Sequence, residues 1–377
     1  MKLLFYLLIP GIATVVYYFM FKFKYNIFLY FIPFATSLLT LWIISSSAEY
    51  SQTKDTEYWG SVIIEAHYEE PWNEYIHKTC TETYSCGTDS KGHTKYCTRT
   101  YDCSYVDYHS AKYYVIDNLG YSYSISKNDY EWYQNRYGNN PKFIDMHRHY
   151  YTQDGDMYVN YWSGTINTHV GYTTKHTYEN RVQASHDVFN FMNIDDSDQT
   201  TYKLFDYPEP DNNYWSSPIL ADSNIRINDT ALLKLSYMNS LLGNKKQLHF
   251  MLLLYNDMTK SSGDIQEQYW KGGNKNEFIV CVGLSKNKVK WCKIISWTEN
   301  QLLKIKVRDY IEKLDEFNQN KFADFIMPTM EKDFQRKRFR DFSYLQVDVP
   351  VWADVLSIIL LLIYSIAFPI ILIKLED

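Results

Sequence analysis

The sequence lacks the short motifs that mark the best-known enzyme classes. It has no phosphate-binding loop, no dinucleotide-binding glycine motif, no HExxH motif and no GxSxG nucleophile elbow. It also lacks an excess of basic residues, since 38 Lys and Arg stand against 44 Asp and Glu and the formal net charge is −6. The only basic cluster lies at residues 336–340. Nucleic-acid binding is therefore not expected, and a non-enzyme is favoured over an enzyme.

Aromatic residues, by contrast, are abundant. The chain of 377 residues contains 36 Tyr, 20 Phe and 10 Trp. Disordered chains contain few aromatic residues, and neither collagen-like nor coiled-coil sequences have this composition. The sequence therefore predicts folded domains, with tyrosines available for a recognition surface.

Charged residues are missing from three stretches that are long enough to cross a bilayer. These are residues 3–21, 25–48 and 355–373. Backbone polar groups must be paired internally in a membrane, so we expect transmembrane helices at 3–21, 26–46 and 354–373. Placing Lys22 and Lys24 in the cytoplasm puts the main body outside it, while the cluster at 336–340 opposes this orientation less strongly. We expect a multi-pass integral membrane protein in the lipid bilayer, with an extracytoplasmic body.

Six cysteines all lie in the central body: Cys80, Cys86, Cys97, Cys103, Cys281 and Cys292. The first four form two pairs that are symmetric about the bond between residues 91 and 92, namely Cys80 with Cys103 and Cys86 with Cys97. The flanks are rich in Thr and Tyr, and residues 88–92 favour a turn. The spacing predicts an antiparallel hairpin over 78–105 with two disulfides on one face.

Two alternatives remain for these cysteines. Four thiolates, helped by His77 or His93, could bind zinc, although two rungs six residues apart on an extended strand are about 20 Å apart. Disulfides would indicate an oxidising compartment, in agreement with an extracytoplasmic body.

Cys281 and Cys292 flank a turn at residues 286–287, and a third disulfide is as compatible with the sequence as two buried thiols.

The body divides into two regions of different character. Residues 58–215 contain short β-branched or aromatic segments separated by Asn, Asp and Gly, and we expect a β-rich, sandwich-like domain with the cysteine hairpin as an insertion. Residues 228–345 alternate between helix and strand. A helix capped at Asn228 or Asp229 and stopped at Gly243 precedes strands at 248–255, 278–282 and 289–295, and two helices follow. The fold class is therefore an α+β membrane protein.

The second region resembles the TPM domain, a small α/β module of membrane-anchored envelope and thylakoid proteins that also precedes a carboxy-terminal span. The matching segments are Leu-Leu-Gly at 241–243, Gln-Leu-His at 247–249 and Trp-Lys-Gly-Gly-Asn-Lys-Asn at 270–276, followed by the strand that begins at Phe278. Residues from Phe322 onward are similar to the closing segment of the family. The Asp-Asn-Gly of the family is replaced by Lys-Asn-Glu at 275–277. The resemblance implies an α/β fold and, as an expectation, the metal or phosphatase chemistry of some members.

Two groups of residues are candidate metal ligands. Asp257 follows a buried strand, where α/β folds bind ligands, and Asp264 and Glu267 come next; together they could bind Mg²⁺ or Ca²⁺. A solvated loop and an amphipathic helix explain the same residues. The second group would lie on one strand face, with Asp154 or Asp156 nearby, and its members are Asp145, His147 and His149. Exposed polar residues flanking a turn are the favoured explanation of this group.

These patterns favour a membrane-anchored extracytoplasmic binding or scaffold protein of the cell envelope, whose partners are envelope or membrane proteins. The alternative is a divalent-metal-dependent hydrolase, similar to a phosphatase, that uses the TPM-like domain. A cytosolic zinc-finger adaptor on a membrane anchor would require the opposite topology.

Overall fold

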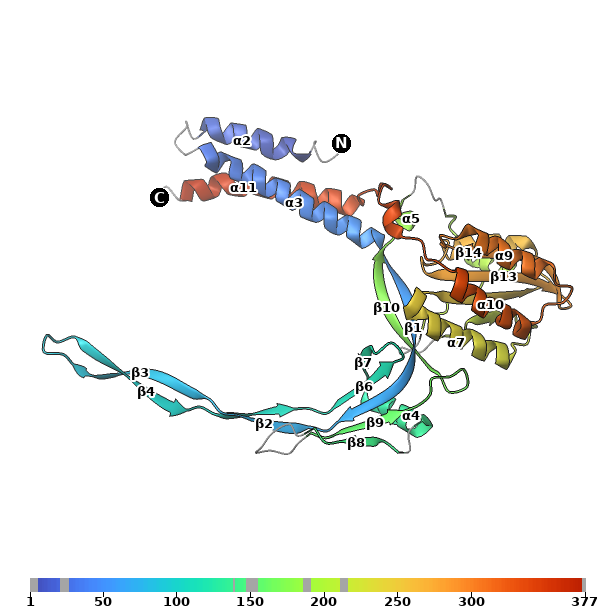
Figure 1. Ribbon diagram of the computed structural model, residues 1–377. Helices are drawn as coiled ribbons and strands as arrows, with labels where there is room; N and C mark the ends of the chain where they lie inside the picture. The colour runs from blue at the N-terminus through green and yellow to red at the C-terminus, as the bar shows by residue number, and fades with distance from the viewer. Residues whose placement is uncertain are drawn as a thin grey trace.

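The computed structural model describes residues 6–20, 27–137, 140–146, 155–185, 191–210 and 216–374. Three parts are visible in Figure 1: apolar helices from both ends of the chain, a β-rich part that extends into a long ribbon, and an α/β part. The structure is therefore of mixed α and β type, with many antiparallel strands.

The apolar segments form helices α2 (Leu8–Met20), α3 (Ile27–Thr53) and α11 (Val351–Lys374), as the sequence predicts. Helices α3 and α11 are long and apolar enough to cross a membrane, whereas α2 is shorter. The three helices lie side by side in Figure 1. Ile44 and Ala48 of α3 pack against Ala353 of α11, and the ring of Tyr17 in α2 lies 6.2 Å from that of Phe368.

Helix α3 leads directly into β1 (Lys54–Glu69), the strand around which the β-rich part is built. The first half of β1 pairs with β10 (Val170–Glu179), and its second half lies between β6 (Lys112–Asp117) and β9 (Met157–Tyr161). All these pairs are antiparallel. The outer strands are β7 (Ser122–Ser124) and β8 (Lys142–Ile144), giving the order β7-β6-β1-β9-β8 with β10 attached to β1.

Helix α4 (Lys127–Tyr137) packs against this sheet. Its Tyr130 and Tyr133 are buried in a cluster with Ile63, Ala66 and Val115. The expected sandwich of two facing sheets is not what the described residues form. A helix with large aromatic side chains supplies the second layer, so a second sheet is not needed to bury this face.

A ribbon of two successive strand pairs projects from the sheet (Figure 1). Strand β2 (Trp72–Ile76) pairs with β5 (Tyr105–His109), and β3 (Thr79–Thr88) then pairs with β4 (Thr94–Asp102). Both predicted disulfides are present, Cys80–Cys103 with a Cα–Cα distance of 5.8 Å and Cys86–Cys97 with one of 5.6 Å. Cys103 directly follows β4, and the other three cysteines lie in β3 and β4. The paired cysteines are not directly opposite each other, in contrast to the sequence prediction, because Cys80 lies opposite Tyr101 and Cys97 lies opposite Tyr84. The disulfides therefore run diagonally across the ribbon.

The α/β part contains a four-stranded sheet in the order β11-β12-β13-β14. Strands β11 (Ile219–Ala221), β12 (His249–Asn256) and β13 (Glu277–Ser285) are parallel, and β14 (Lys288–Ser296) is antiparallel to β13. The three longer strands agree with the predicted ones. Strand β11 was not predicted, and it extends the sheet upstream of the expected boundary at residue 228.

Helices cover both faces of this sheet. Residues of α7 (Asp229–Lys246), α9 (Gln301–Glu312) and α10 (Gln319–Asp333) share one hydrophobic core with the sheet, and α8 (Lys260–Tyr269) lies on the other face. The predicted cap of α7 is present, because the side chain of Asn228 accepts a hydrogen bond from the amide of Ala231. The remaining short elements are α5 (Arg181–Ala184), α6 (Asp196–Tyr202) and the 3-10 helix η1 (Phe339–Phe342).

Gly243 does not end α7, contrary to the sequence prediction. The helix continues to Lys246, and Gln247 takes the left-handed conformation at its end. Gly243 lies instead against the backbone of Gly60 in β1, where an added Cβ would be 2.5 Å from the Cα of Gly60 and closer still to its backbone nitrogen and oxygen. The glycine is therefore required by the close packing of a helix on a strand.

We predict that Gly243→Ala destabilises the protein. Alanine favours a helix interior by up to about 1 kcal/mol over glycine, but here its methyl group would displace the backbone of β1. Overpacking of this kind typically costs about 1–3 kcal/mol. The thermal midpoint Tm of the detergent-solubilised chain should therefore fall. Gly11→Ala is the matched control, since a Cβ there meets nothing within 4 Å; an unchanged or higher Tm for Gly243→Ala would contradict the packing argument.

Candidate functional site

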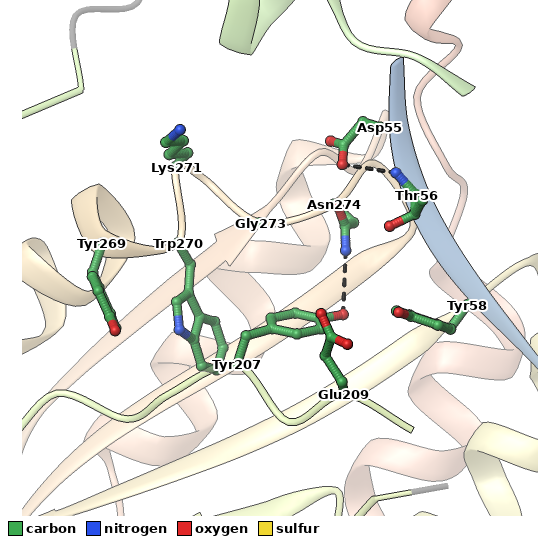
Figure 2. Close-up of a pocket in the computed structure, with 10 residues that line it drawn as sticks. All are labelled: Asp55, Thr56, Tyr58, Tyr207, Glu209, Tyr269, Trp270, Lys271, Gly273 and Asn274. Atoms are coloured by element: carbon green, nitrogen blue, oxygen red, sulfur yellow. Dashed lines mark hydrogen bonds between the residues drawn. The ribbon is translucent and has the colours of Figure 1, made fainter. Parts of the chain in front are cut away.

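A pocket of about 370 Å³ lies where β1 meets the α/β part (Figure 2). It is bounded by the start of β1, by the loop between α8 and β13, and by the segment at residues 207–209. Its lining residues are Asp55, Thr56, Tyr58, Tyr207, Glu209, Tyr269, Trp270, Lys271, Gly273 and Asn274. The pocket thus joins residues from regions that are distant in the sequence.

A buried carboxylate supports one wall of the pocket. Glu277, at the start of β13, is only 1% exposed. Its carboxylate accepts hydrogen bonds from the Tyr207 hydroxyl, from the Asn274 amide at 2.7 Å and from the Asn274 side chain at 3.0 Å. His249 Nδ1 lies 3.4 Å from Glu277 Oε1. Burial and the nearby Glu277 carboxylate raise the pKa of Tyr207 well above its usual value, so Tyr207 remains a neutral donor.

The loop between α8 and β13 owes its path to glycine. Gly273 has a φ of 74°, and an added Cβ would lie 2.8 Å from Glu277 Oε2. A residue with a side chain at this position would be strained and would also crowd the buried carboxylate. Gly273 therefore allows the Asn274 amide to face Glu277.

Asp55 forms the opposite wall of the pocket, and neighbouring groups donate hydrogen bonds to both of its carboxylate oxygens. Its Oδ2 accepts hydrogen bonds from the Tyr178 hydroxyl at 2.8 Å and from Asn180 Nδ2 at 2.7 Å, and its Oδ1 accepts one from the Thr56 amide at 2.7 Å. Burial, followed by the charge of Asp55, raises the pKa of Tyr178. Asp55 thus fixes β10 and the start of α5 to β1, and it acts mainly as a structural acceptor.

A second buried carboxylate, Glu57, anchors the α/β part to β1. Arg336 donates to it at 2.9 Å and 3.2 Å, and Lys275 Nζ lies 3.2 Å from Oε1. Burial lowers the pKa of Lys275, and Glu57 partly offsets that effect. Removing one member of such a group leaves an unpaired buried charge, which typically costs about 3–5 kcal/mol. This cluster therefore stabilises the junction behind the pocket.

The polar lining of the pocket is suited to binding a polar ligand. Its wall offers the hydroxyls of Tyr58 and Tyr207, the Asn274 amide, and the charged groups of Glu209 and Lys271.

The structure does not bring together the predicted metal ligands Asp257, Asp264 and Glu267. Lys293 Nζ lies 2.9 Å from Asp264 Oδ1 and 2.7 Å from Glu267 Oε2, and it neutralises both carboxylates. The carboxylate of Asp257 accepts a hydrogen bond from Asn256 instead. Among the residues that the structure describes, these three do not form a group whose ligand atoms lie within 4.8 Å of one another. The predicted Mg²⁺ or Ca²⁺ site is therefore not assembled.

The other candidate metal group is only partly placed. Asp145 is exposed just after β8, whereas His147 and His149 lie outside the described residues. The backbone oxygen of Asp156 accepts a hydrogen bond from the amide of Glu70.

Cys281 and Cys292 are buried free thiols, and the third disulfide is not formed. The predicted two-residue turn is present at Lys286 and Asn287, both of which have positive φ. The register of β13 and β14 then shifts between Leu284 and Gly283, so that Cys292 lies opposite Val282 and not opposite Cys281. Side chains alternate between faces along a strand, and the shift places the two sulfurs in different cores on opposite faces of the sheet.

Sequence reasoning missed the pocket itself. Tyr207 lies in an irregular segment, and Asp55 and Tyr58 belong to a strand more than 200 residues from Asn274. One local signal was present, since Glu277 is an acidic residue at the start of a strongly apolar strand. A buried carboxylate there requires hydrogen-bond partners, but the sequence alone does not show which residues supply them.

A scan against models of protein families found no match, and searches of curated proteins and of solved structures found none either. The resemblance of residues 228–345 to the TPM domain therefore stays a prediction.

We predict that thiol labelling distinguishes the two kinds of cysteine. Burial raises the pKa of Cys292 to about 12 and also raises that of Cys281, so neither thiol should react in the native protein near neutral pH. Intact mass after alkylation should show no modified thiol in the native protein, two after denaturation without reductant, and six after reduction. Four or more modified thiols in the denatured, unreduced protein would contradict the two disulfides.

We also predict that acidification destabilises the junction through His176, whose ring stacks on that of Trp59 at 3.7 Å. Burial, followed by the charges of Lys275 and Arg336, lowers the pKa of His176. The unfolded chain, with a pKa of about 6.5, then binds more protons than the native one, so stability falls as the pH drops below about 6.5 towards the native pKa. The decrease in Tm between pH 7.5 and 5.5 should be smaller in His176→Phe and unchanged in His93→Ala. Equal decreases in wild type and His176→Phe would contradict this assignment.

Proposed function

We propose that this chain is a membrane-anchored extracytoplasmic binding protein, and that the disulfide-containing ribbon contacts other envelope or membrane proteins. The observation that carries the proposal is the projection of β3 and β4 from the body as a pair of strands that bond only to each other within the described sheets (Figure 1). Two disulfides hold this pair together. A rigid projection of this kind has little structural role in the body, and it is well suited to binding.

The ribbon presents two different faces. On one face of β3 and β4, the disulfides are accompanied by Tyr84, Tyr101 and an ion pair of Arg99 with Glu82 at 2.9 Å. On the other face, pairs of threonines at residues 81–100 and 83–98 lie opposite each other. The face with the disulfides therefore offers aromatic area together with charges of both signs.

Exposed tyrosines continue along the whole ribbon. The exposed fraction is 69% for Tyr96 near the tip and 65% for Tyr108 near the base. Tyrosine provides a large contact area at a low cost in side-chain entropy, and it is common in binding surfaces. The disulfides restrict the ribbon before binding, which reduces the entropy lost on association.

The helices and the disulfides support the membrane location. Helices α3 and α11 frame the body in the sequence, and Arg181 joins them to it by pairing with Glu49 near the end of α3 and with the backbone oxygen of Leu345 ahead of α11. Disulfides persist in oxidising compartments, so the ribbon belongs outside the cytoplasm. A TPM-like α/β domain next to the last helix is consistent with this arrangement. For the alternative of a metal-dependent hydrolase, the described residues around Asp257 offer no group of three metal-ligand atoms that lie close together.

Site-specific photocrosslinking in native membranes tests the proposal. A photoreactive phenylalanine analogue is incorporated in place of Tyr96 on the ribbon or, as a matched control, in place of Tyr344, which is 70% exposed on the body. We expect a discrete crosslinked product from position 96, at least about tenfold more abundant than from position 344. The double variant Cys86→Ser, Cys97→Ser should decrease the yield at position 96, because the ribbon is then less constrained.

Three results would contradict the proposal. One is equal crosslinking from both positions, and another is no crosslinked product from position 96. The third is labelling of the ribbon by a reagent that reacts only in the cytoplasm. Circular dichroism and membrane extraction of each variant are the controls that test whether the body remains folded and inserted.

A further inference from the structure

At the base of the ribbon, three side chains with metal-binding groups lie on one face of β2 and β5. Glu74 is directly opposite Asp107, and His109 is two residues further along β5, on the same side as Asp107. His109 Nε2 lies 2.9 Å from Glu74 Oε2. One ligand atom from each of the three residues lies within 4.8 Å of the other two, and no other group of three such residues does so in the described part of the chain.

The two carboxylates lie directly opposite each other, and a cation between them would stabilise this arrangement. Like charges directly opposite each other on antiparallel strands destabilise the pair. Among the described residues, no hydrophobic cluster includes a residue of β2 or β5, and both disulfides lie further along the ribbon. A cation bound between Glu74 and Asp107 would convert the repulsion into a crosslink of β2 to β5.

The imidazole of His109 is already oriented for this role. Its ring stacks on the ring of Trp72, with centroids 4.1 Å apart and an interplanar angle of 12°. Trp72 is the residue directly opposite His109 in the register. Stacking fixes the ring plane and directs Nε2 towards Glu74, so little side-chain entropy remains to be lost when a metal binds.

We propose that Glu74, Asp107 and His109 form a binding site for a divalent transition-metal ion such as Zn²⁺. Ligand atoms around a tetrahedral zinc ion are roughly 3.3 Å apart, so side-chain rotation alone can bring the present groups to that geometry. One imidazole and two carboxylates suit zinc better than Mg²⁺ or Ca²⁺, which take mainly oxygen ligands in larger number. Asp107 is exposed, and the fourth position is open to water or to a ligand atom from a partner.

Zinc titration of the full-length, detergent-solubilised chain tests the site. The protein is first treated with a chelator and then titrated with Zn²⁺ in competition with a chromophoric chelator. We expect one site per chain with a Kd in the micromolar range or tighter. His109→Ala and Glu74→Gln should each weaken binding by at least about tenfold. His93→Ala is the matched control, because His93 pairs with Asp89 at the ribbon tip, outside the proposed site, and its affinity should equal that of wild type.

A thermal measurement separates metal binding from a purely structural effect. Without metal, Glu74→Gln should raise Tm, because it removes the repulsion from Asp107. Zn²⁺ should raise Tm in wild type and raise it less in Glu74→Gln. Wild-type zinc affinity in Glu74→Gln or His109→Ala, or the absence of stoichiometric binding in wild type, would overturn the proposal. Loss of binding in the double variant His147→Ala, His149→Ala, with His109→Ala unaffected, would overturn it too. Metal binding here is independent of protein binding by the ribbon, since crosslinking from position 96 reports the latter separately.

Discussion

The contact of the Gly60 backbone with the Gly243 backbone determines how the two folded parts of the body meet. No side chain separates β1 from α7 at this point, so the helix backbone packs directly against the strand backbone. The neighbouring side chain on α7, Asn244, then reaches across and donates to Ser61 at 2.6 Å, to Asp117 at 3.0 Å and to Tyr123 at 3.1 Å. A larger separation would leave these buried polar groups without partners, which costs more than the hydrogen bonds themselves contribute. Close backbone packing and polar satisfaction therefore depend on each other.

The pocket and the buried charges follow from the same junction. Strand β1 brings Asp55 and Glu57 from the β-rich part against the loop that precedes β13, where Asn276 donates to the Tyr58 carbonyl at 2.8 Å. Charged groups at such a junction can be buried only if cations or donors meet them, and Arg336 and Lys275 do so at Glu57. The pocket of Figure 2 therefore lies at the junction that these buried groups stabilise, and Asp55 also lines it. A ligand bound in this pocket would contact residues of both parts.

Sequence patterns predicted the structural features that depend on residues close together in the sequence. The apolar helices, the strand at 249–256, the cap at Asn228 and both disulfides follow from local composition and spacing, and all agree with the structure. Features set by distant residues were missed or wrong. Single-residue register shifts moved Cys281 and Cys292 to opposite faces, and Gly243 turned out to serve a contact with Gly60 that lies 183 positions away. The pocket combines Asp55, Tyr207 and Asn274, and no local pattern could have connected them.

The ribbon is stabilised in a different way from the body. The body is held by buried cores, whereas β3 and β4 bury little surface and depend on two disulfides for their order. A two-stranded pair alone is marginally stable in water, so a crosslink is needed wherever no core is available. This requirement is met along β3 and β4 but not along β2 and β5, where Glu74 and Asp107 instead face each other. A bound metal would meet the same requirement there, and it would make the rigidity of the ribbon depend on the metal as well as the redox state of the compartment.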